Sequence, residues 1–214
     1  NTGAAIGTGL AQSSNIKLAA DASIGGTGDF ALLTYSYAAT NLDLAGFKLT
    51  KVGSNTFTLV NATVTAGSIQ IDSGVISQFN NSHNLSNVAV TLANTAGAAL
   101  NLNSLNMSVG TLSGGGTTGG NINLGSGTLT VNQAGTTSYN GIISGSGGLT
   151  KQGTGSLTLG GLNTFSGNVL ISAGVLVSAA SNTATGALGG FNGAVTKVVV
   201  QPGGTVDING SAQA

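Results

Sequence analysis

The chain has 214 residues, of which 5% are charged and 40% are hydrophobic, and its five lysines balance its five aspartates. This charge content lies far below the usual value of about 25%, so no field exists to steer nucleic acid, anionic lipid or an acidic substrate. The hydrophobic content argues against a disordered chain, and the absence of cysteine excludes disulfides, thiolate catalysis and sulfur-ligated metals.

Apolar residues two positions apart predict short β-strands along the whole chain, because such residues share one face of a strand. In the first 46 residues, strands are expected at 16–18 and 42–44, with a further candidate at 30–37. Residues 11–22 are compatible with a helix or an irregular loop. Later strands are expected at 88–92, 100–102, 105–109, 122–124, 129–131, 142–143, 198–200 and 206–208.

Polar and glycine-rich segments separate these strands. Residues 78–86 (QFNNSHNLS) and 179–193 predict loops that leave the strands, and 114–120 (GGGTTGG) predicts a mobile turn. Pro202, the only proline, falls in a turn where no ladder N–H is required. The N-terminus lacks the basic region and apolar run of a signal peptide, and no stretch approaches the ~18 apolar residues of a membrane span. Both ends are expected to have been cut from a longer chain.

An internal repeat organises the sequence. Residues 49–77 align without gaps to residues 149–177, at a constant offset of 100 residues. Each copy contains several short strands that cannot bury their apolar faces alone, so stacking of copies into a β-solenoid is expected. If the offset reflects whole turns, Leu59 and Leu159 point into the core from the same wall of the solenoid.

The second copy contains the pattern LTKQGTGSLTL, then NTFSG, an apolar pair and AGVL. This pattern resembles the autotransporter-associated β-strand repeat, found in the secreted passenger regions of Gram-negative autotransporters. Residues 148–177 match closely, 48–77 more loosely, and 204–210 resemble one further strand. The resemblance implies an all-β fold, a single-stranded right-handed parallel β-helix, with residues 1–214 forming one continuous segment of a longer chain.

The residues that could support catalysis are few and scattered. His83 is the only histidine and is expected to be a solvated loop residue, so neither a Ser-His-Asp triad nor a three-histidine metal site is predicted. Stacking could pair the carboxylates of Asp43 and Asp72, as glycosidases require, but strand-end aspartates are ordinarily solvated. No catalytic, cofactor-binding or metal-binding residue is therefore assigned.

Other motifs are interpreted as structural. Residues 25–29 (GGTGD) place the aspartate one position too early for a calcium nonapeptide, and no tandem copy follows. Lys51 and Lys151 occupy equivalent repeat positions and are expected to be structural lysines that face a turn. The hydroxyl residues around Phe57, Leu129 and Leu157 are expected to point outward. Similar threonine arrays occur on ice-binding solenoids, but threonine also simply favours strands.

These observations predict a non-enzymatic adhesive or structural segment of a secreted or surface-displayed autotransporter-like protein. The alternatives are a self-assembling matrix or envelope filament and, third, a β-helix carbohydrate-active enzyme. We expect self-association through the ends or sides of the solenoid, and a host-surface or matrix ligand is possible. No cofactor, nucleic-acid partner or membrane insertion of this segment is expected. The expected location is extracellular or at the Gram-negative cell surface.

Overall fold

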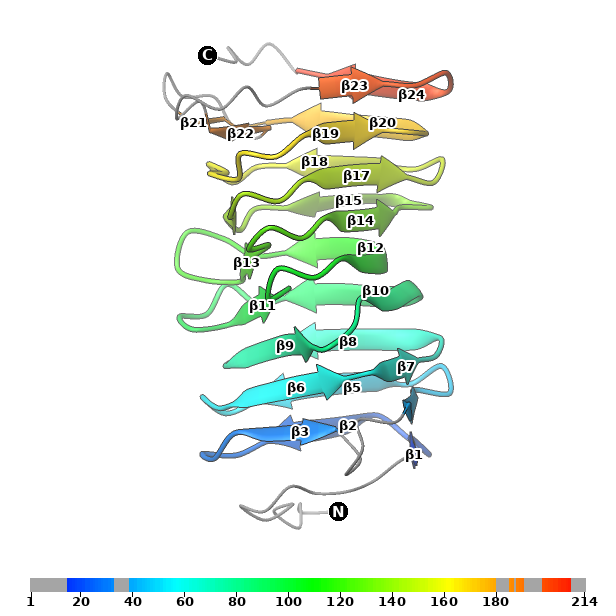
Figure 1. Ribbon diagram of the computed structural model, residues 1–214, viewed down its shortest axis with the longest axis vertical. Coiled ribbons are helices and arrows are strands. Elements are labelled where there is room, and N and C mark those ends of the chain that lie inside the picture. Colours follow the sequence, from blue (N-terminus) through cyan, green and yellow to red (C-terminus); the bar gives the residue numbers. More distant parts are fainter. Residues whose placement is uncertain (1–14, 33–38, 180–184, 187, 191–197, 209–214) are drawn as a thin grey trace.

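The computed structural model describes residues 15–32, 39–179, 185–186, 188–190 and 198–208. Its strands stack along one axis as a parallel β-solenoid, and no helix occurs among the described residues (Figure 1). The predicted all-β solenoid is therefore confirmed. The one antiparallel pair described, β21 (Thr185–Gly186) with β22 (Gly189–Gly190), lies in the segment predicted as a loop.

The solenoid has three walls, each a ladder of parallel strands. The first wall contains β2 (Ala22–Gly25), β5 (Lys48–Val52), β8 (Gly67–Ile71), the second halves of β10 (His83–Leu92) and β12 (Met107–Gly114), β15 (Thr136–Tyr139), β18 (Ser156–Leu159), β20 (Gly174–Ser178) and β24 (Gly204–Asp207). The second contains β3 (Phe30–Leu32), β6 (Thr56–Val60), β9 (Val75–Phe79), β11 (Ala99–Asn101), β13 (Asn121–Asn123) and β16 (Ile143–Ser144).

The third wall is formed in two parts. The first is a three-stranded sheet of β1 (Asn15–Lys17), β4 (Thr40–Asp43) and β7 (Ala62–Val64). The second begins with the first halves of β10 and β12 and continues through β14 (Leu129–Asn132), β17 (Leu149–Gln152), β19 (Val169–Ile171) and β23 (Val198–Val200). β10 and β12 therefore each contribute to two walls, and a register shift between Leu85 and Ala89 marks the corner.

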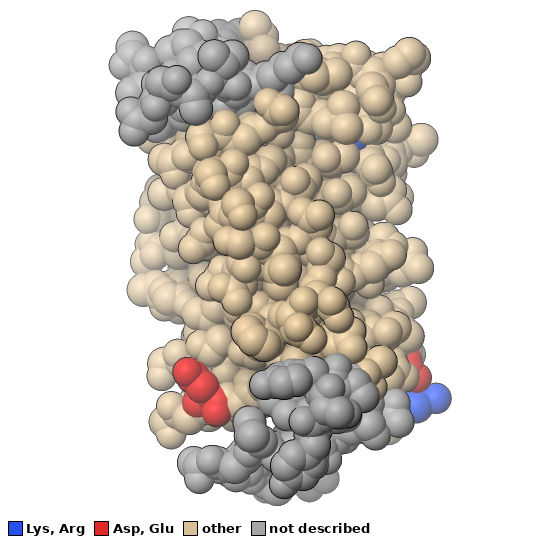
Figure 2. Space-filling view, viewed as in Figure 1, with Lys and Arg blue, Asp and Glu red and all other residues tan. Residues whose placement is uncertain are grey.

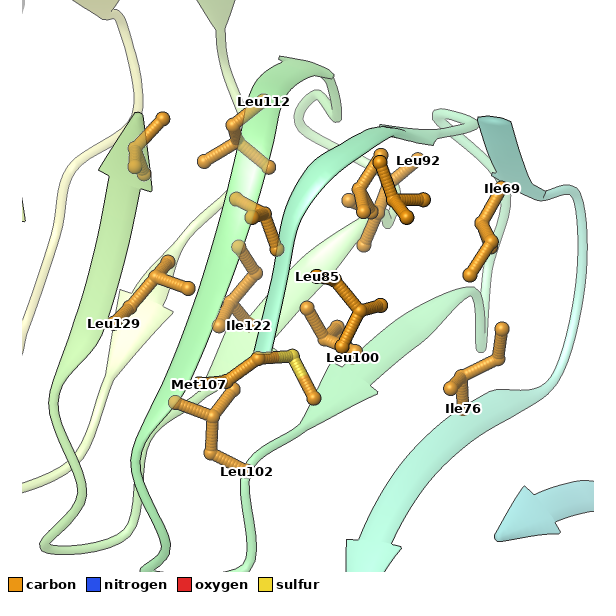
Figure 3. Close-up of a cluster of buried hydrophobic side chains, with 14 of the residues drawn as sticks. Ile69, Ile76, Leu85, Leu92, Leu100, Leu102, Met107, Leu112, Ile122 and Leu129 are labelled. Carbon is orange, nitrogen blue, oxygen red and sulfur yellow. The ribbon is translucent and has the colours of Figure 1, made fainter. Parts of the chain in front are cut away.

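The core consists of columns of inward-facing residues from successive coils. One column joins Leu49, Ile69, Val90 and Leu112, each at most 3% exposed. Figure 3 shows such side chains converging from different walls, with Ile69 and Leu92 from the first and Ile76 and Leu100 from the second. Stacking thus buries the apolar faces of strands that are too short to be stable alone.

The repeat register is only partly as predicted. Leu59 and Leu159 are both fully buried, which confirms their inward orientation. They nevertheless lie on different walls, because β6 belongs to the second wall and β18 to the first. The prediction of a shared wall is wrong, since the 100-residue offset does not equal a whole number of turns.

The strand pairing shows the size of this mismatch. Paired positions connect Lys51 through successive coils to Leu159, 108 residues further on. Lys151 stacks instead on Val131 and Ile171 of the third wall. The second repeat copy is therefore displaced by one wall relative to the first, although its inward and outward positions are kept.

Several predicted loops differ in the structure. Residues 78–86 do not leave the stack, since β9 ends at Phe79 and β10 begins at His83. In the segment 114–120, predicted as a mobile turn, Gly116 N donates to Gly119 O at 3.0 Å and Thr118 N donates to Asn94 Oδ1 at 2.8 Å; its mobility stays a prediction. Strand β3 covers 30–32, whereas 33–38 lie outside the described residues. In the described part of 11–22, β1 occurs in place of a helix; residues 11–14 are not described.

Close contact between coils requires glycine at one corner of the solenoid. A Cβ on Gly147 would lie 1.7 Å from Gly127 O, whereas a Cβ on Gly135 would meet no atom within 4 Å. We therefore expect Gly147→Ala to force adjacent coils apart and to destabilise the protein by about 1–3 kcal/mol. The matched Gly135→Ala should lie within about 0.5 kcal/mol of the parent chain. Urea unfolding of the two variants measures the difference, and equal midpoints would contradict the proposed contact.

Candidate functional surface

The two repeat lysines are buried and bind the carbonyl groups of turns. Both side chains are 0% exposed. Lys51 Nζ donates to Val52 O, Gly53 O, Asn55 Oδ1 and Ser73 O at 2.8–3.2 Å. Lys151 Nζ donates to Gln152 O, Gly153 O and Ala173 O at 2.7–3.3 Å. Each lysine therefore joins its own turn to the next coil.

Burial lowers the pKa of both lysines because desolvation disfavours the charged ammonium. Asp29 partly opposes this effect at Lys51. With only carbonyl and amide acceptors around each Nζ and no opening to solvent, neither lysine is placed to act on a substrate. The predicted structural, turn-facing role agrees with this geometry, although complete burial was not predicted.

His83 is not the solvated loop residue that the sequence predicted. Its side chain is 3% exposed and lies at the start of β10. Nδ1 lies 2.9 Å from Gln78 Oε1, and Nε2 accepts a hydrogen bond from Ala62 N at 3.1 Å. Sequence reasoning missed the fully buried Gln78. A signal for His83 was available, because it precedes Leu85 by two positions and so shares the inward phase of β10.

The candidate carboxylates are engaged separately. Asp43 accepts from Thr65 Oγ1 at 2.6 Å and from Ala45 N at 2.9 Å, and lies 3.6 Å from Lys17 Nζ. The hydrogen bond from Thr65 and then that from Ala45 N lower the pKa of Asp43. Asp72 instead accepts from Gln70 Nε2 at 3.0 Å. Neither set of contacts resembles an acid–base pair arranged around a substrate.

The glycine-rich segment at 25–29 forms a turn fixed by the neighbouring coil. Asp29 Oδ1 accepts from Thr56 N at 2.6 Å, and Asn55 bridges Gly26 N and Gly28 O. Across the described part of the chain, no three His, Cys, Asp or Glu residues gather where they could hold a metal ion. Over the same residues, no helix is long and apolar enough to cross a membrane.

The outer surface has an unusual distribution of charge. Residues 73–196 contain one charged residue, Lys151, and its side chain is buried. Figure 2 shows the result: apart from one small basic patch near the C-terminal end, the acidic and basic atoms lie at the N-terminal end, and the middle coils present uncharged residues on this face. A partner of these coils must therefore be recognised by hydrogen bonds and apolar contact, because ion pairs are not available.

Hydroxyl and amide side chains occupy outward positions in register on the walls. Ser108, Thr130 and Thr150 follow one another on the third wall, where the row ends in Leu170 and Val199. On the first wall, Thr91 Oγ1 and Ser113 Oγ lie 2.9 Å apart. The predicted outward orientation of the hydroxyl residues that flank Phe57, Leu129 and Leu157 is confirmed. These three apolar residues are at most 2% exposed, and neighbouring residues of a strand point to the opposite face.

A shallow groove of about 440 Å³ crosses the third wall at this row. Its lining includes Ser126, Ser146, Asn168 and Leu170, with Gly148 between longer side chains. At the C-terminal coil, Val198 and Val200 are 39% and 43% exposed, although their neighbours Val169 and Ile171 are fully buried. The surface features of the described coils are thus hydroxyl rows, a neutral groove and the exposed valines of β23.

The walls, the buried lysines and the repeated glycine turns define a repeat-built β-solenoid that displays a neutral surface. The passenger-associated-transport-repeat family model matches residues 49–77 and 149–177, so the chain carries two copies of the autotransporter-associated repeat, as the sequence predicted. The chain is also similar to the adhesin BmaC autotransporter of Brucella suis biovar 1 (strain 1330), with 34% identity over 160 residues, or 71% of this chain. It spans about 5% of the length of that relative. No solved structure matches the chain.

Proposed function

We propose that the chain is a non-enzymatic adhesive segment of an autotransporter passenger, displayed at or released from a Gram-negative cell surface. The uncharged outer surface of residues 73–179 is the observation that supports this function most directly. It offers hydroxyl, amide and apolar groups along successive coils, which suits repeated weak contacts with another surface. The two matched repeats and the similarity to a protein named as an adhesin support the same proposal.

In this proposal, residues 1–214 are one continuous stretch of a longer solenoid, and a host-surface or matrix molecule serves as ligand. Adhesion is tested with beads that carry the chain, applied to cell layers and matrix-coated wells at 50 and 300 mM salt. Binding above that of albumin-coated beads, equal at both salt concentrations, is expected because the coils proposed to make contact, within residues 73–179, carry no exposed charged side chain. Binding no greater than that of albumin would contradict the adhesive function.

Self-association of the chain is expected on the same physical grounds. The net charge is zero, so little repulsion opposes contact between copies. In the isolated chain, the outer edges of β23 and β24, which pair with no further strand of the described residues, and the exposed Val198 and Val200 provide a surface for end-to-end contact. Sedimentation at several protein concentrations should show association that increases with concentration and is almost unchanged between low and physiological salt.

Two variants distinguish ends from sides in that measurement. Val200→Asp places a charge at the C-terminal coil, and Thr130→Asp places one on the outward row of the third wall. Reduced association in only one of them identifies the surface involved. A strictly monomeric parent chain at high concentration would contradict self-association, and strong salt dependence would contradict its uncharged mechanism.

A self-assembling filament subunit is the second candidate, and the zero net charge, which leaves little repulsion between copies, favours it. End-to-end contact alone, without adhesion of the coated beads, would support this candidate over an adhesive segment. A carbohydrate-active enzyme is less well supported, because Asp43 and Asp72 are engaged in separate hydrogen-bond sets.

A further inference from the structure

A seam interrupts the backbone ladder of the third wall. β7 is the last strand of the three-stranded sheet, while β10 belongs to the larger sheet, and the two strands are not paired. They nevertheless pack against each other in adjacent coils (Figure 1). At this seam, the Ala62 N–H of β7 donates to Nε2 of His83 at 3.1 Å. A side-chain nitrogen thus takes the place of a ladder carbonyl.

The surrounding hydrogen bonds define the protonation state of His83. The Gln78 amide nitrogen donates to Leu102 O, Leu105 O and Asn106 O, at 2.9, 2.9 and 3.2 Å. Gln78 Oε1 must therefore be the atom that faces His83, where it accepts from His83 N and from Nδ1–H. This assigns the neutral Nδ1–H tautomer from the network, with Nε2 as the acceptor for Ala62.

A proton on Nε2 cannot be accommodated in this arrangement. The resulting N–H would face the N–H of Ala62, so a hydrogen bond would be replaced by two opposed donors. No titratable or charged side chain other than His83 occurs on β7, β8, β9, β10 or β12, the strands packed at the seam, and Gln78, whose side chain contacts the ring, is neutral. The new charge would therefore be buried without a counter-ion.

Water has a route to the outer side of the seam. A hollow of about 210 Å³ is lined by Ala62 and Thr63 of β7 and by Ser82 and Asn84 beside His83. The other two walls remain continuous across the same coils, because β8 pairs with residues 88–92 of β10 and β6, β9 and β11 pair in sequence. Only the third wall depends on a side chain at this point.

We propose that the seam between β7 and β10 is an acid-sensitive joint. Protonation of His83 at Nε2 breaks the link to Ala62 and opens the third wall locally, while the first and second walls hold the coils together. The N-terminal coils thereby loosen at low pH without unfolding of the solenoid. Burial also lowers the pKa of His83, and the backbone of Asn81 partly opposes this effect. The closed seam therefore resists protonation of the ring, and the seam opens when the ring is protonated.

Amide hydrogen exchange of the full chain at pH 7.0 and pH 5.0, corrected for intrinsic exchange rates, tests the joint. In the open seam His83 has the ordinary histidine pKa of about 6.5, so each pH unit below that value favours the open state about tenfold. Protection of the Ala62 amide should fall by the same factor, until the pH reaches the lower pKa that His83 has in the closed seam. Protection at Ile69 and Val131, on paired ladders, should remain unchanged. In His83→Gln, which has no titrating ring, protection at Ala62 should not depend on pH.

Nitrogen NMR of the His83 ring in the parent chain provides a measurement that does not depend on the variant folding. The Nδ1–H tautomer at pH 7 is expected. An Nε2–H tautomer, equal protection of Ala62 at both pH values, or an equal loss of protection at Val131 would each overturn the proposal.

Discussion

Leu159→Asp is expected to destabilise the solenoid by several kcal/mol, whereas the adjacent Thr158→Ser should cost less than about 0.5 kcal/mol. Leu159 is fully buried in β18, between Tyr139 and Ser178 of the neighbouring coils, and a carboxylate there would have no counter-ion. Thr158 lies on the outward phase of the same strand and keeps its hydroxyl as serine. Thermal unfolding of the two variants under identical conditions measures the difference.

The comparison also tests the orientation of the strand. Neighbouring residues of a strand point to opposite faces, so a slip of one residue would exchange the two effects. Equal melting temperatures, or a larger loss for Thr158→Ser, would show that the inward and outward faces of β18 are reversed.

The alternation of apolar residues was sufficient to predict the fold class and the inward faces. Leu59 and Leu159 were both identified as core residues because period-two patterning depends only on local sequence. Their walls could not be predicted in the same way, because wall assignment depends on the length of every intervening coil. The long strands β10 and β12 turn a corner within the strand, and nothing in their apolar pattern indicates where that corner lies.

The buried polar residues were the main failure of sequence reasoning. The composition of residues 78–86 predicts a loop that leaves the strands, yet Gln78 and His83 are hydrogen-bonded to each other inside the stack. A polar composition shows that a segment can be exposed to solvent, but it does not show that the segment is exposed. A polar side chain can also be buried wherever its hydrogen bonds are satisfied. The phase of each residue relative to neighbouring apolar positions was the better signal, since His83-x-Leu85 and Leu149-x-Lys151 both place the polar residue inward.

The inward position of Lys151 can be tested by substitution. Lys151→Met preserves the aliphatic stem but removes the ammonium group that donates to Gly153 O and Ala173 O, while Gln152 O keeps its hydrogen bond from Gln133 N. We expect a loss of roughly 2–4 kcal/mol in unfolding free energy. The destabilisation from the unpaired carbonyl acceptors should exceed the stabilisation gained by removing a buried charge. Lys48→Met is the matched control: Lys48 is exposed, and its effect should be within about 0.5 kcal/mol.

The pH dependence of Lys151→Met separates the charge from the packing. Because burial lowers the pKa of Lys151, the unfolded chain binds more protons than the folded chain between that lowered value and the ordinary pKa of about 10.4. The unfolding free energy of the parent chain should therefore rise with pH between these two pKa values. The rise should be smaller in Lys151→Met. Measurements between pH 8 and 9.5 avoid tyrosine ionisation, which acts in the opposite direction at Tyr139 because burial raises its pKa. Identical slopes in the two proteins would contradict the lowered pKa of Lys151 and its burial between the coils.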